Sequence, residues 1–223
     1  MRTKVPGSGL EGRRLYLCTP ARTDLERFVA ACVGGGVDVV QLRDKDLSAR
    51  ELLAAGRRVQ GVCADLGVPF VMNDRPDLAL EMGAAGVHVG QDDVPVSLAR
   101  RILGPGAIVG LSTHSPADLA GALEEDVDYI SAGPVVPTPT KPGRAGTGLD
   151  YAARAVAQAP GPVFVTGGVT PTTVAPLVDA GVRHFVVVRW LTQAADPGEA
   201  ARLLRGTIEA ALAGVPPTPT ALS

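Results

Sequence analysis

The sequence predicts a single-domain (β/α)8 TIM barrel, and three observations lead to this prediction. Short apolar runs alternate with longer amphipathic segments eight times along the chain, which indicates repeated β/α units. Most of these apolar runs are continuous rather than alternating, as in parallel strands that are covered on both faces. Eight such units in about 200 residues match the small end of the size range of this fold.

The strand candidates follow one another at regular intervals. They cover residues 14–19, 38–43, 69–74, 86–90, 108–113, 128–135, 163–168 and 184–189. Helical patterns lie between them, as in residues 49–66, where Leu52 and Val59 recur near helical spacing. Thr170 before Pro171 pairs a capping hydroxyl with a proline, which is typical of a helix start.

The barrel domain is expected to span residues 13–213. Residues 1–12 are polar and rich in glycine and residues 214–223 are rich in proline and threonine, so both are expected to be short disordered tails. A doubly wound open sheet is the competing architecture. It is disfavoured because no GxGxxG motif follows the first strand candidate.

The composition disfavours several kinds of partner. Lys and Arg total 21 against 23 Asp and Glu, whereas a general nucleic-acid binder concentrates basic charge. No apolar run approaches the roughly 18 residues of a membrane span, and no signal peptide is recognisable. We therefore expect a cytoplasmic protein with neither nucleic-acid nor membrane partners; the sequence leaves open whether it forms a homo-oligomer. Three cysteines without metal-ligand spacing are expected to be buried free thiols.

Polar side chains follow the predicted strands at the end where a (β/α)8 barrel forms its active site. They are Gln41, Arg43, Lys45, Asn73, Asp74, His88, Gln91, Asp92, Asp93, Ser112, Thr113, His114, Thr138, Thr140, Lys141 and Arg189. Buried cations cost several kcal/mol unless an anion offsets their charge. The basic residues of this group therefore predict an anionic ligand.

Asp74 and Asp93 are expected to end neighbouring strands, which lie about 4.8 Å apart. Two carboxylates at that separation repel each other unless a cation or a proton intervenes. Oxygen ligands of this kind suit Mg²⁺, which shares its coordination with water and substrate phosphates. Beside Arg43, Lys45 and Lys141, the pair predicts a Mg²⁺-diphosphate site. The simpler alternative is that Asp93 caps the following helix.

A second anion site is predicted at Gly167-Gly168, which precede the helix start at Thr170. Glycines there let backbone N–H groups approach a phosphate at a helix N-terminus, although an ordinary tight turn would use them equally well. Among the histidines, His88 fits a hydrogen-bonded core residue as well as a ligand, whereas His184 begins a strand at the opposite end and is expected to be structural. His114 stands in a loop where it can contact a substrate.

Six stretches fall in order from the second strand to the seventh: VVQLRDK, FVMNDRPDLAL, GVHVGQDD, GLSTH, YISAGPVVPTPTK and TGG. Together they resemble the thiamine-phosphate synthase (thiamine-phosphate pyrophosphorylase) family over nearly the whole chain. The resemblance implies a transferase that condenses 4-amino-2-methyl-5-(diphosphomethyl)pyrimidine with a thiazole phosphate. Its products would be thiamine monophosphate and pyrophosphate, and its metal ion Mg²⁺.

The resemblance also implies a role for each site residue. The residues around the diphosphate would be Gln41, Arg43, Lys45, Asn73 and, bridging to it, Lys141. Asp74 and Asp93 would hold Mg²⁺, and Ser112 would lie near the pyrimidine and the leaving group. The thiazole phosphate would be held by Thr138, Thr140, and the backbone at Gly168, Val188 and Arg189. Of these residues, those expected to act in catalysis are Arg43, Lys45, Ser112 and Lys141.

The chain departs from the family pattern after the eighth strand, where Arg189-Trp190 replaces an expected small residue followed by alanine. Arg189 either contacts the thiazole phosphate or packs with Trp190 at the barrel rim. Residues 137–148 form a long loop rich in proline and glycine, which is expected to close over the substrates.

Two other functions compete with synthesis of thiamine phosphate. A thiazole tautomerase-like isomerase would use the same scaffold but would not need the full set of diphosphate and metal residues. A non-catalytic barrel that binds thiamine precursors would keep the fold without the reaction. The cations favour the synthase, because they would stabilise a leaving pyrophosphate. The thiazole nitrogen is itself a nucleophile, so the absence of a convincing acid/base pair agrees with this reaction.

Overall fold

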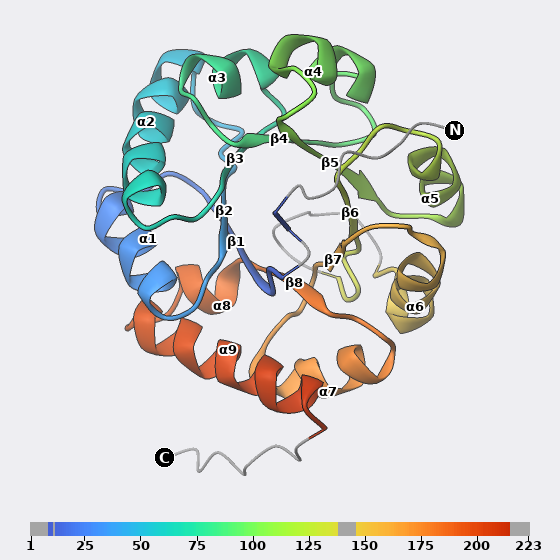
Figure 1. The fold of residues 1–223 in the computed structure, drawn as a ribbon. Helices are drawn as coiled ribbons and strands as arrows, with labels where there is room; N and C mark the ends of the chain where they lie inside the picture. The colour runs from blue at the N-terminus through green and yellow to red at the C-terminus, as the bar shows by residue number, and fades with distance from the viewer. Residues whose placement is uncertain (1–8, 11, 138–145, 215–223) are drawn as a thin grey trace.

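The computed structural model describes residues 9–10, 12–137 and 146–214. Within these residues, eight parallel strands pair in chain order and close into a barrel, with the helices on its outside (Figure 1). The (β/α)8 barrel is therefore confirmed, and the open doubly wound sheet is excluded.

The bounds of the elements follow the expected order. The strands are β1 (Leu15–Thr19), β2 (Val39–Leu42), β3 (Phe70–Asn73), β4 (Gly86–Val89), β5 (Ile108–Thr113), β6 (Tyr129–Ala132), β7 (Val163–Val165) and β8 (His184–Val187). The helices are α1 (Leu25–Gly34), α2 (Ala49–Asp65), α3 (Pro76–Glu81), α4 (Val96–Leu103), α5 (Pro116–Leu123), α6 (Gly148–Gln158), α7 (Pro171–Asp179), α8 (Arg189–Thr192) and α9 (Pro197–Leu212).

Three strands end two or three residues earlier than expected. β6 stops at Ala132 and β7 at Val165, because a Gly-Pro pair and a turn with two glycines at positive φ follow them. β8 stops at Val187, so the expectation that Arg189 ends this strand was wrong. Arg189 is instead the first residue of the short helix α8.

The barrel encloses one apolar cluster, and a larger one lies between the strands and the outer helices. The inner cluster contains Tyr16, Val39, Tyr129 and Phe164, which point toward the barrel axis from four different strands. Leu10 belongs to this cluster and is fully buried, although it lies in the segment that we expected to be a tail. The side chain of Leu10 thus adds to the packing inside the barrel.

Alternation along the strands places a polar layer above this apolar interior. Residues two positions further along each strand point to the same side, so the inner cluster is followed by inward-facing polar side chains. These buried polar residues are Gln41, Asn73, His88, Ser112 and Ser131. The strands thus carry the apolar core at their beginning and the candidate site at their end.

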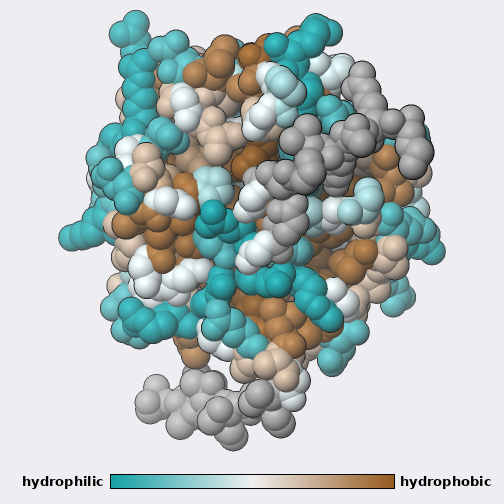
Figure 2. Space-filling view, viewed as in Figure 1, coloured by the Kyte–Doolittle hydropathy of each residue, from teal (hydrophilic) through white to brown (hydrophobic). Residues whose placement is uncertain are grey.

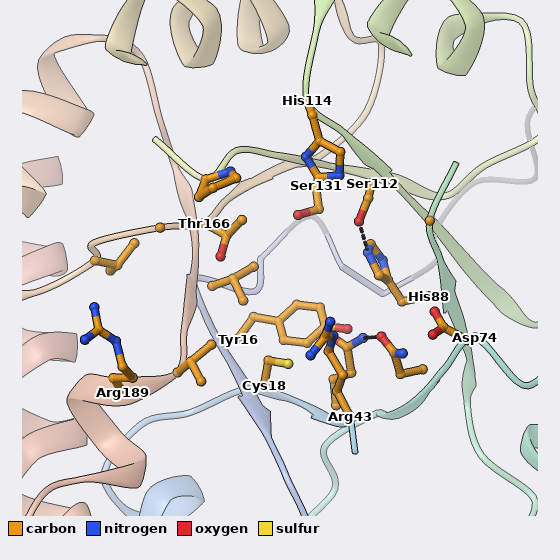
Figure 3. Close-up of a pocket in the computed structure, with 18 of the residues that line it drawn as sticks. Tyr16, Cys18, Arg43, Asp74, His88, Ser112, His114, Ser131, Thr166 and Arg189 are labelled. Carbon is orange, nitrogen blue, oxygen red and sulfur yellow. Dashed lines mark hydrogen bonds between the residues drawn. The ribbon is translucent and has the colours of Figure 1, made fainter. Parts of the chain in front are cut away.

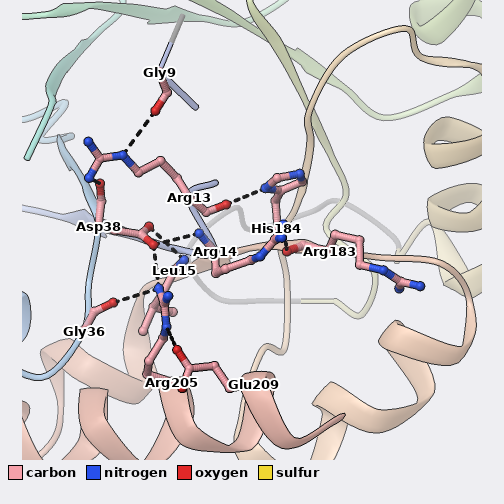
Figure 4. Close-up of polar contacts among 10 residues, drawn as sticks. All are labelled: Gly9, Arg13, Arg14, Leu15, Gly36, Asp38, Arg183, His184, Arg205 and Glu209. Carbon is pink, nitrogen blue, oxygen red and sulfur yellow. Dashed lines mark hydrogen bonds and ion pairs between the residues drawn. The ribbon is translucent and has the colours of Figure 1, made fainter. Parts of the chain in front are cut away.

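A separate polar network joins α9 to the beginning of the barrel (Figure 4). Asp38 accepts hydrogen bonds from the backbone amides of Arg14 at 2.8 Å and Leu15 at 3.0 Å, and it pairs with Arg205 at 2.5 Å. His184 is hydrogen-bonded to a backbone carbonyl nearby. His184 therefore lies in a structural network, as expected.

The polarity of the outer surface is set by the amphipathic helices, whose polar faces point away from the barrel. Hydrophilic side chains lie around the rim of the face shown in Figure 2, over the outer helices. Among the described residues, no helix is long and apolar enough to cross a membrane. Cys18, Cys32 and Cys63 are buried thiols that form no disulfide, as predicted, and burial raises the pKa of Cys32 and Cys63 to about 12.

Candidate active site

A cavity of about 360 Å³ opens at the C-terminal end of the barrel (Figure 3). Ten of the predicted site residues line it: Gln41, Arg43, Lys45, Asn73, Asp74, Asp93, Ser112, Gly168, Val188 and Arg189. Thr138, Thr140, Lys141 and most of the predicted lid lie outside the described residues. The fold therefore gathers these ten residues, spread over some 150 positions of sequence, in one cavity.

Two amides on neighbouring strands form one wall of the cavity. Gln41 Nε2 donates to Asn73 Oδ1 at 2.8 Å, and both side chains are buried. This bond fixes the orientation of both amides, which leaves Oε1 of Gln41 and Nδ2 of Asn73 available to other partners. The wall thus offers a ligand one acceptor and one donor.

A cation and two carboxylates stand beside these amides. Lys45 Nζ lies 3.0 Å from Asp74 Oδ2, and Asp74 has a φ of 60°, which is uncommon for a residue other than glycine. Asp93 lies in the loop after β4, so the expectation that it ends a strand was wrong. Its Oδ2 accepts the amide of Gly90 at 2.8 Å. The N-cap of α4 is Pro95, which excludes the alternative that Asp93 caps that helix.

The two carboxylates influence each other's ionisation. Burial, together with a hydrogen bond to Asp93, raises the pKa of Asp74. Burial also opposes ionisation of Asp93, but hydrogen bonds from Asp74 and from the Gly90 amide lower the pKa of Asp93 overall. Ionisation of both carboxylates together is therefore opposed unless a cation compensates their charge.

This pair fits a bound Mg²⁺ better than a structural ion pair. A cation would compensate the charge of these two neighbouring carboxylates, and carboxylate oxygens are preferred ligands of Mg²⁺. In the part of the chain that the structure describes, no third acidic, cysteine or histidine side chain completes a metal cluster. Water and substrate oxygens would have to complete the coordination.

His88 connects the cavity to the barrel interior. Its Nε2 lies 2.8 Å from Ser112 Oγ, and its Nδ1 lies 2.9 Å from the hydroxyl of Tyr129. Gln91 Nε2 donates to the backbone carbonyl of Ser112 at 2.7 Å. His88 is therefore a hydrogen-bonded core residue that also lines the cavity, and its role as a ligand stays a prediction.

The turn after β7 has the geometry of an anion site. Gly167 and Gly168 adopt φ values of 94° and 77°, and a Cβ at Gly168 would lie 2.4 Å from Val136. Only glycine fits both conditions without strain. Among the hydrogen bonds of the described residues, none uses the backbone amides of residues 167–169, which leaves these donors for a ligand.

Arg189 and Trp190 both line the cavity but make different contacts. Trp190 Nε1 donates to the carbonyl of Ala200 at 3.0 Å and so attaches α8 to α9. Arg189 lines the cavity on the side opposite Asp74 (Figure 3). Neither Arg189, which is exposed, nor Arg43 forms an ion pair with the described acidic residues, so both guanidinium groups are open to an anionic ligand.

Sequence reasoning did not select Tyr16, Cys18, Tyr129, Ser131 or Thr166, which also line the cavity. Tyr16 and Tyr129 lie two positions before Cys18 and Ser131 on their strands and so face the same side. This alternation was the only signal that could have identified them.

Comparisons with known proteins agree with this geometry. The family model for thiamine monophosphate synthase matches residues 15–191. A thiamine-phosphate synthase from Thermobifida fusca is 47% identical over 210 residues, covering 92% of this chain and 96% of that protein. One from Mycobacterium bovis is 44% identical over 219 residues, covering 92% of this chain and 98% of that protein.

A solved structure is also similar. The thiamine phosphate pyrophosphorylase from Pyrococcus furiosus superposes with a TM-score of 0.82 at 28% identity, covering 91% of this chain and 98% of that chain. The likeness therefore extends over the whole barrel.

Proposed function

Because this chain belongs to the thiamine monophosphate synthase family and is a transferase, we propose that its cavity joins a pyrimidinylmethyl diphosphate to a thiazole phosphate and releases pyrophosphate. The observation that supports this best is the presence of basic side chains on two sides of the cavity. Asp74, with Lys45 at 3.0 Å, lies on one side of it, and Arg189 lies on the other (Figure 3).

The diphosphate binds beside Lys45, Arg43 and the amide wall. Asn73 Nδ2 donates to a diphosphate oxygen, and Gln41 holds Asn73 in place through its hydrogen bond. Arg43 has no acidic partner among the described residues, so its charge is available to the leaving group. Lys141 is proposed to add a further cation from the loop that lies outside the described residues.

Asp74 and Asp93 would hold Mg²⁺ through their carboxylates, with the diphosphate and water as the other ligands. When bound, the cation neutralises negative charge on the departing pyrophosphate. Lys45 lies 3.0 Å from Asp74, so it holds this carboxylate and adds positive charge to the same side of the cavity.

The thiazole phosphate binds on the opposite side. The free amides of the Gly167-Gly168 turn and the backbone at Val188 donate to its oxygens, and the guanidinium of Arg189 forms a charge-assisted contact. Thr138 and Thr140 are proposed to complete this site from outside the described residues. The phosphate thus orients the thiazole nitrogen toward the pyrimidine.

Bond breaking precedes attack in this proposal. The aminopyrimidine stabilises a cation at its methylene carbon once the C–O bond to the diphosphate breaks, and the pyrophosphate takes the electron pair. The thiazole nitrogen then donates its lone pair to that carbon. No general base is required, which agrees with a cavity that presents cations, amides and hydroxyls.

Mass spectrometry of purified protein with both substrates and Mg²⁺ tests this proposal. Thiamine monophosphate should form only when both substrates are present. An isomerised thiazole without condensation, which nuclear magnetic resonance distinguishes because the isomers have equal mass, would support the tautomerase-like alternative. Tight binding of both compounds without any product would support the non-catalytic one.

A further inference from the structure

A chain of four side chains crosses the barrel interior and ends at the cavity. The hydroxyls of Tyr16 and Tyr129 lie 2.9 Å apart, Tyr129 reaches Nδ1 of His88, and Nε2 of His88 reaches Ser112 Oγ. These residues come from β1, β6, β4 and β5. All four line the cavity but are at most 8% exposed, so water has little access to these bonds.

The backbone is shaped to admit this chain. Gly110 of β5 pairs with His88 on one side and with Tyr129 on the other. A Cβ at Gly110 would lie 2.5 Å from the hydroxyl oxygen of Tyr129, so only glycine leaves room for the phenol. The rings of His88 and Tyr129 stack with centroids 5.4 Å apart and an interplanar angle of 22°.

With His88 neutral, the protons of this chain can run in two directions. In one, Tyr16 donates to Tyr129, Tyr129 donates to Nδ1 of His88, and Nε2–H donates to Ser112 Oγ. In the other, Ser112 donates to Nε2 and every later bond reverses. The proton of Tyr16 would then need an acceptor outside the chain although this residue is only 1% exposed, and the neighbouring thiol of Cys18 is a weak acceptor.

The first direction gives both tyrosine hydroxyls an acceptor and leaves only the hydroxyl proton of Ser112 outside the chain. Burial raises the pKa of both tyrosines, so both phenols keep their protons. Because Ser112 accepts from His88, its own hydroxyl proton is free to turn into the cavity. A serine held in this way presents a donor to the ligand rather than a lone pair.

We propose that Tyr129 is a positioning residue that fixes His88 as its Nε2–H tautomer and thereby makes Ser112 a hydrogen-bond donor to the leaving group. The effect on catalysis rests on the proposed function, whereas the tautomer does not. Tyr129 itself acts through His88 and needs no contact with either substrate.

Nuclear magnetic resonance on protein labelled with ¹⁵N-histidine tests the tautomer directly. Only three histidines are present, so His88 is assigned by comparing spectra with a His88→Gln variant. Long-range ¹⁵N–¹H correlations should show a proton on Nε2 and an unprotonated Nδ1. A proton on Nδ1 would overturn the proposal. This measurement uses the unmodified chain, so it stands even where a variant fails to fold.

Kinetics then test whether Tyr129 acts through Ser112. Tyr129→Phe should lower kcat about 3- to 10-fold, as expected for loss of one oriented hydrogen bond, with little change in either KM. Added to Ser112→Ala, the same change should lower kcat less than about twofold further, because both variants remove one interaction. If the effects of the two substitutions on kcat multiply instead, Tyr129 does not act through Ser112 and the proposal is refuted.

Tyr151→Phe is the matched control, since it removes the hydroxyl of another buried tyrosine, on α6 and outside the cavity. It should leave kcat and the His88 spectrum unchanged, and thermal melting checks that each variant is folded. A fall in kcat for Tyr151→Phe equal to that for Tyr129→Phe would assign both effects to packing and contradict the proposal. If the unmodified protein makes no product, the proposed function fails while the tautomer result remains.

Discussion

Arg189 provides the sharpest test of the second anion site, because it differs from the family pattern. It begins α8, lines the cavity and has no acidic partner among the described residues. Arg189→Ala removes the guanidinium but leaves the attachment of α8 intact, since that attachment depends on the bond from Trp190 to Ala200. The substitution therefore separates charge from packing.

The expected loss of substrate affinity follows from the kind of contact that is removed. A hydrogen bond to a charged group contributes about 1.5–3 kcal/mol, which corresponds to roughly 10- to 150-fold weaker binding. Arg189→Ala should weaken binding of the thiazole phosphate by this factor. The diphosphate substrate should bind nearly as before, because Lys45 and Arg43 lie on other loops.

Separate titrations of each substrate against the folded variant measure both effects. Trp190→Phe is the control: it keeps an aromatic ring but loses the Nε1 bond, so it should lower the melting temperature more than it changes either affinity. An unchanged affinity of Arg189→Ala for the thiazole phosphate would refute the contact and leave packing at the rim as the explanation.

Three further predictions concern the carboxylates and the network at the opposite end of the barrel. Asp93→Asn should lower turnover about 100-fold and abolish the rise in melting temperature that Mg²⁺ with pyrophosphate produces in the parent protein; an equal rise in both would exclude Asp93 as a ligand. The raised pKa of Asp74 means that a proton competes with a cation below that pKa, so Mg²⁺ affinity, followed by fluorescence of the single tryptophan, should fall as the pH falls through it; a pH-independent affinity would contradict this. Asp38→Ala should reduce the free energy of unfolding in urea by about 2–4 kcal/mol with unchanged KM values, because it leaves two backbone amides without their acceptor and removes one of the two carboxylates that pair with Arg205; a change in KM instead would contradict a purely structural role.

The sequence predicted the barrel and most of the cavity because both depend on periodicity. Alternation along β2 and β3 orients Gln41 and Asn73 inward, and parallel strands bring their ends to one side. Positions outside the strands were less predictable. Arg189 starts a helix and Asp93 lies in a loop, where backbone geometry no longer follows a period of two.

The hydrogen-bonded chain could not be predicted because it joins residues that are distant in sequence. Tyr16 and Tyr129 read as ordinary apolar strand residues, and their contact depends on the diameter of the closed barrel. Gly110, which makes space for Tyr129, could not be interpreted from the sequence either. A glycine inside a strand such as β5 usually weakens it, and its purpose here is apparent only from the opposing ring.

Release of pyrophosphate tests the central claim most directly. An enzyme-coupled assay should detect one pyrophosphate for each thiamine monophosphate formed, only with both substrates and a divalent cation. Omission of the thiazole phosphate should reduce release to slow hydrolysis. Product formation without pyrophosphate, or full pyrophosphate release without the thiazole phosphate, would contradict a cavity that joins two bound substrates.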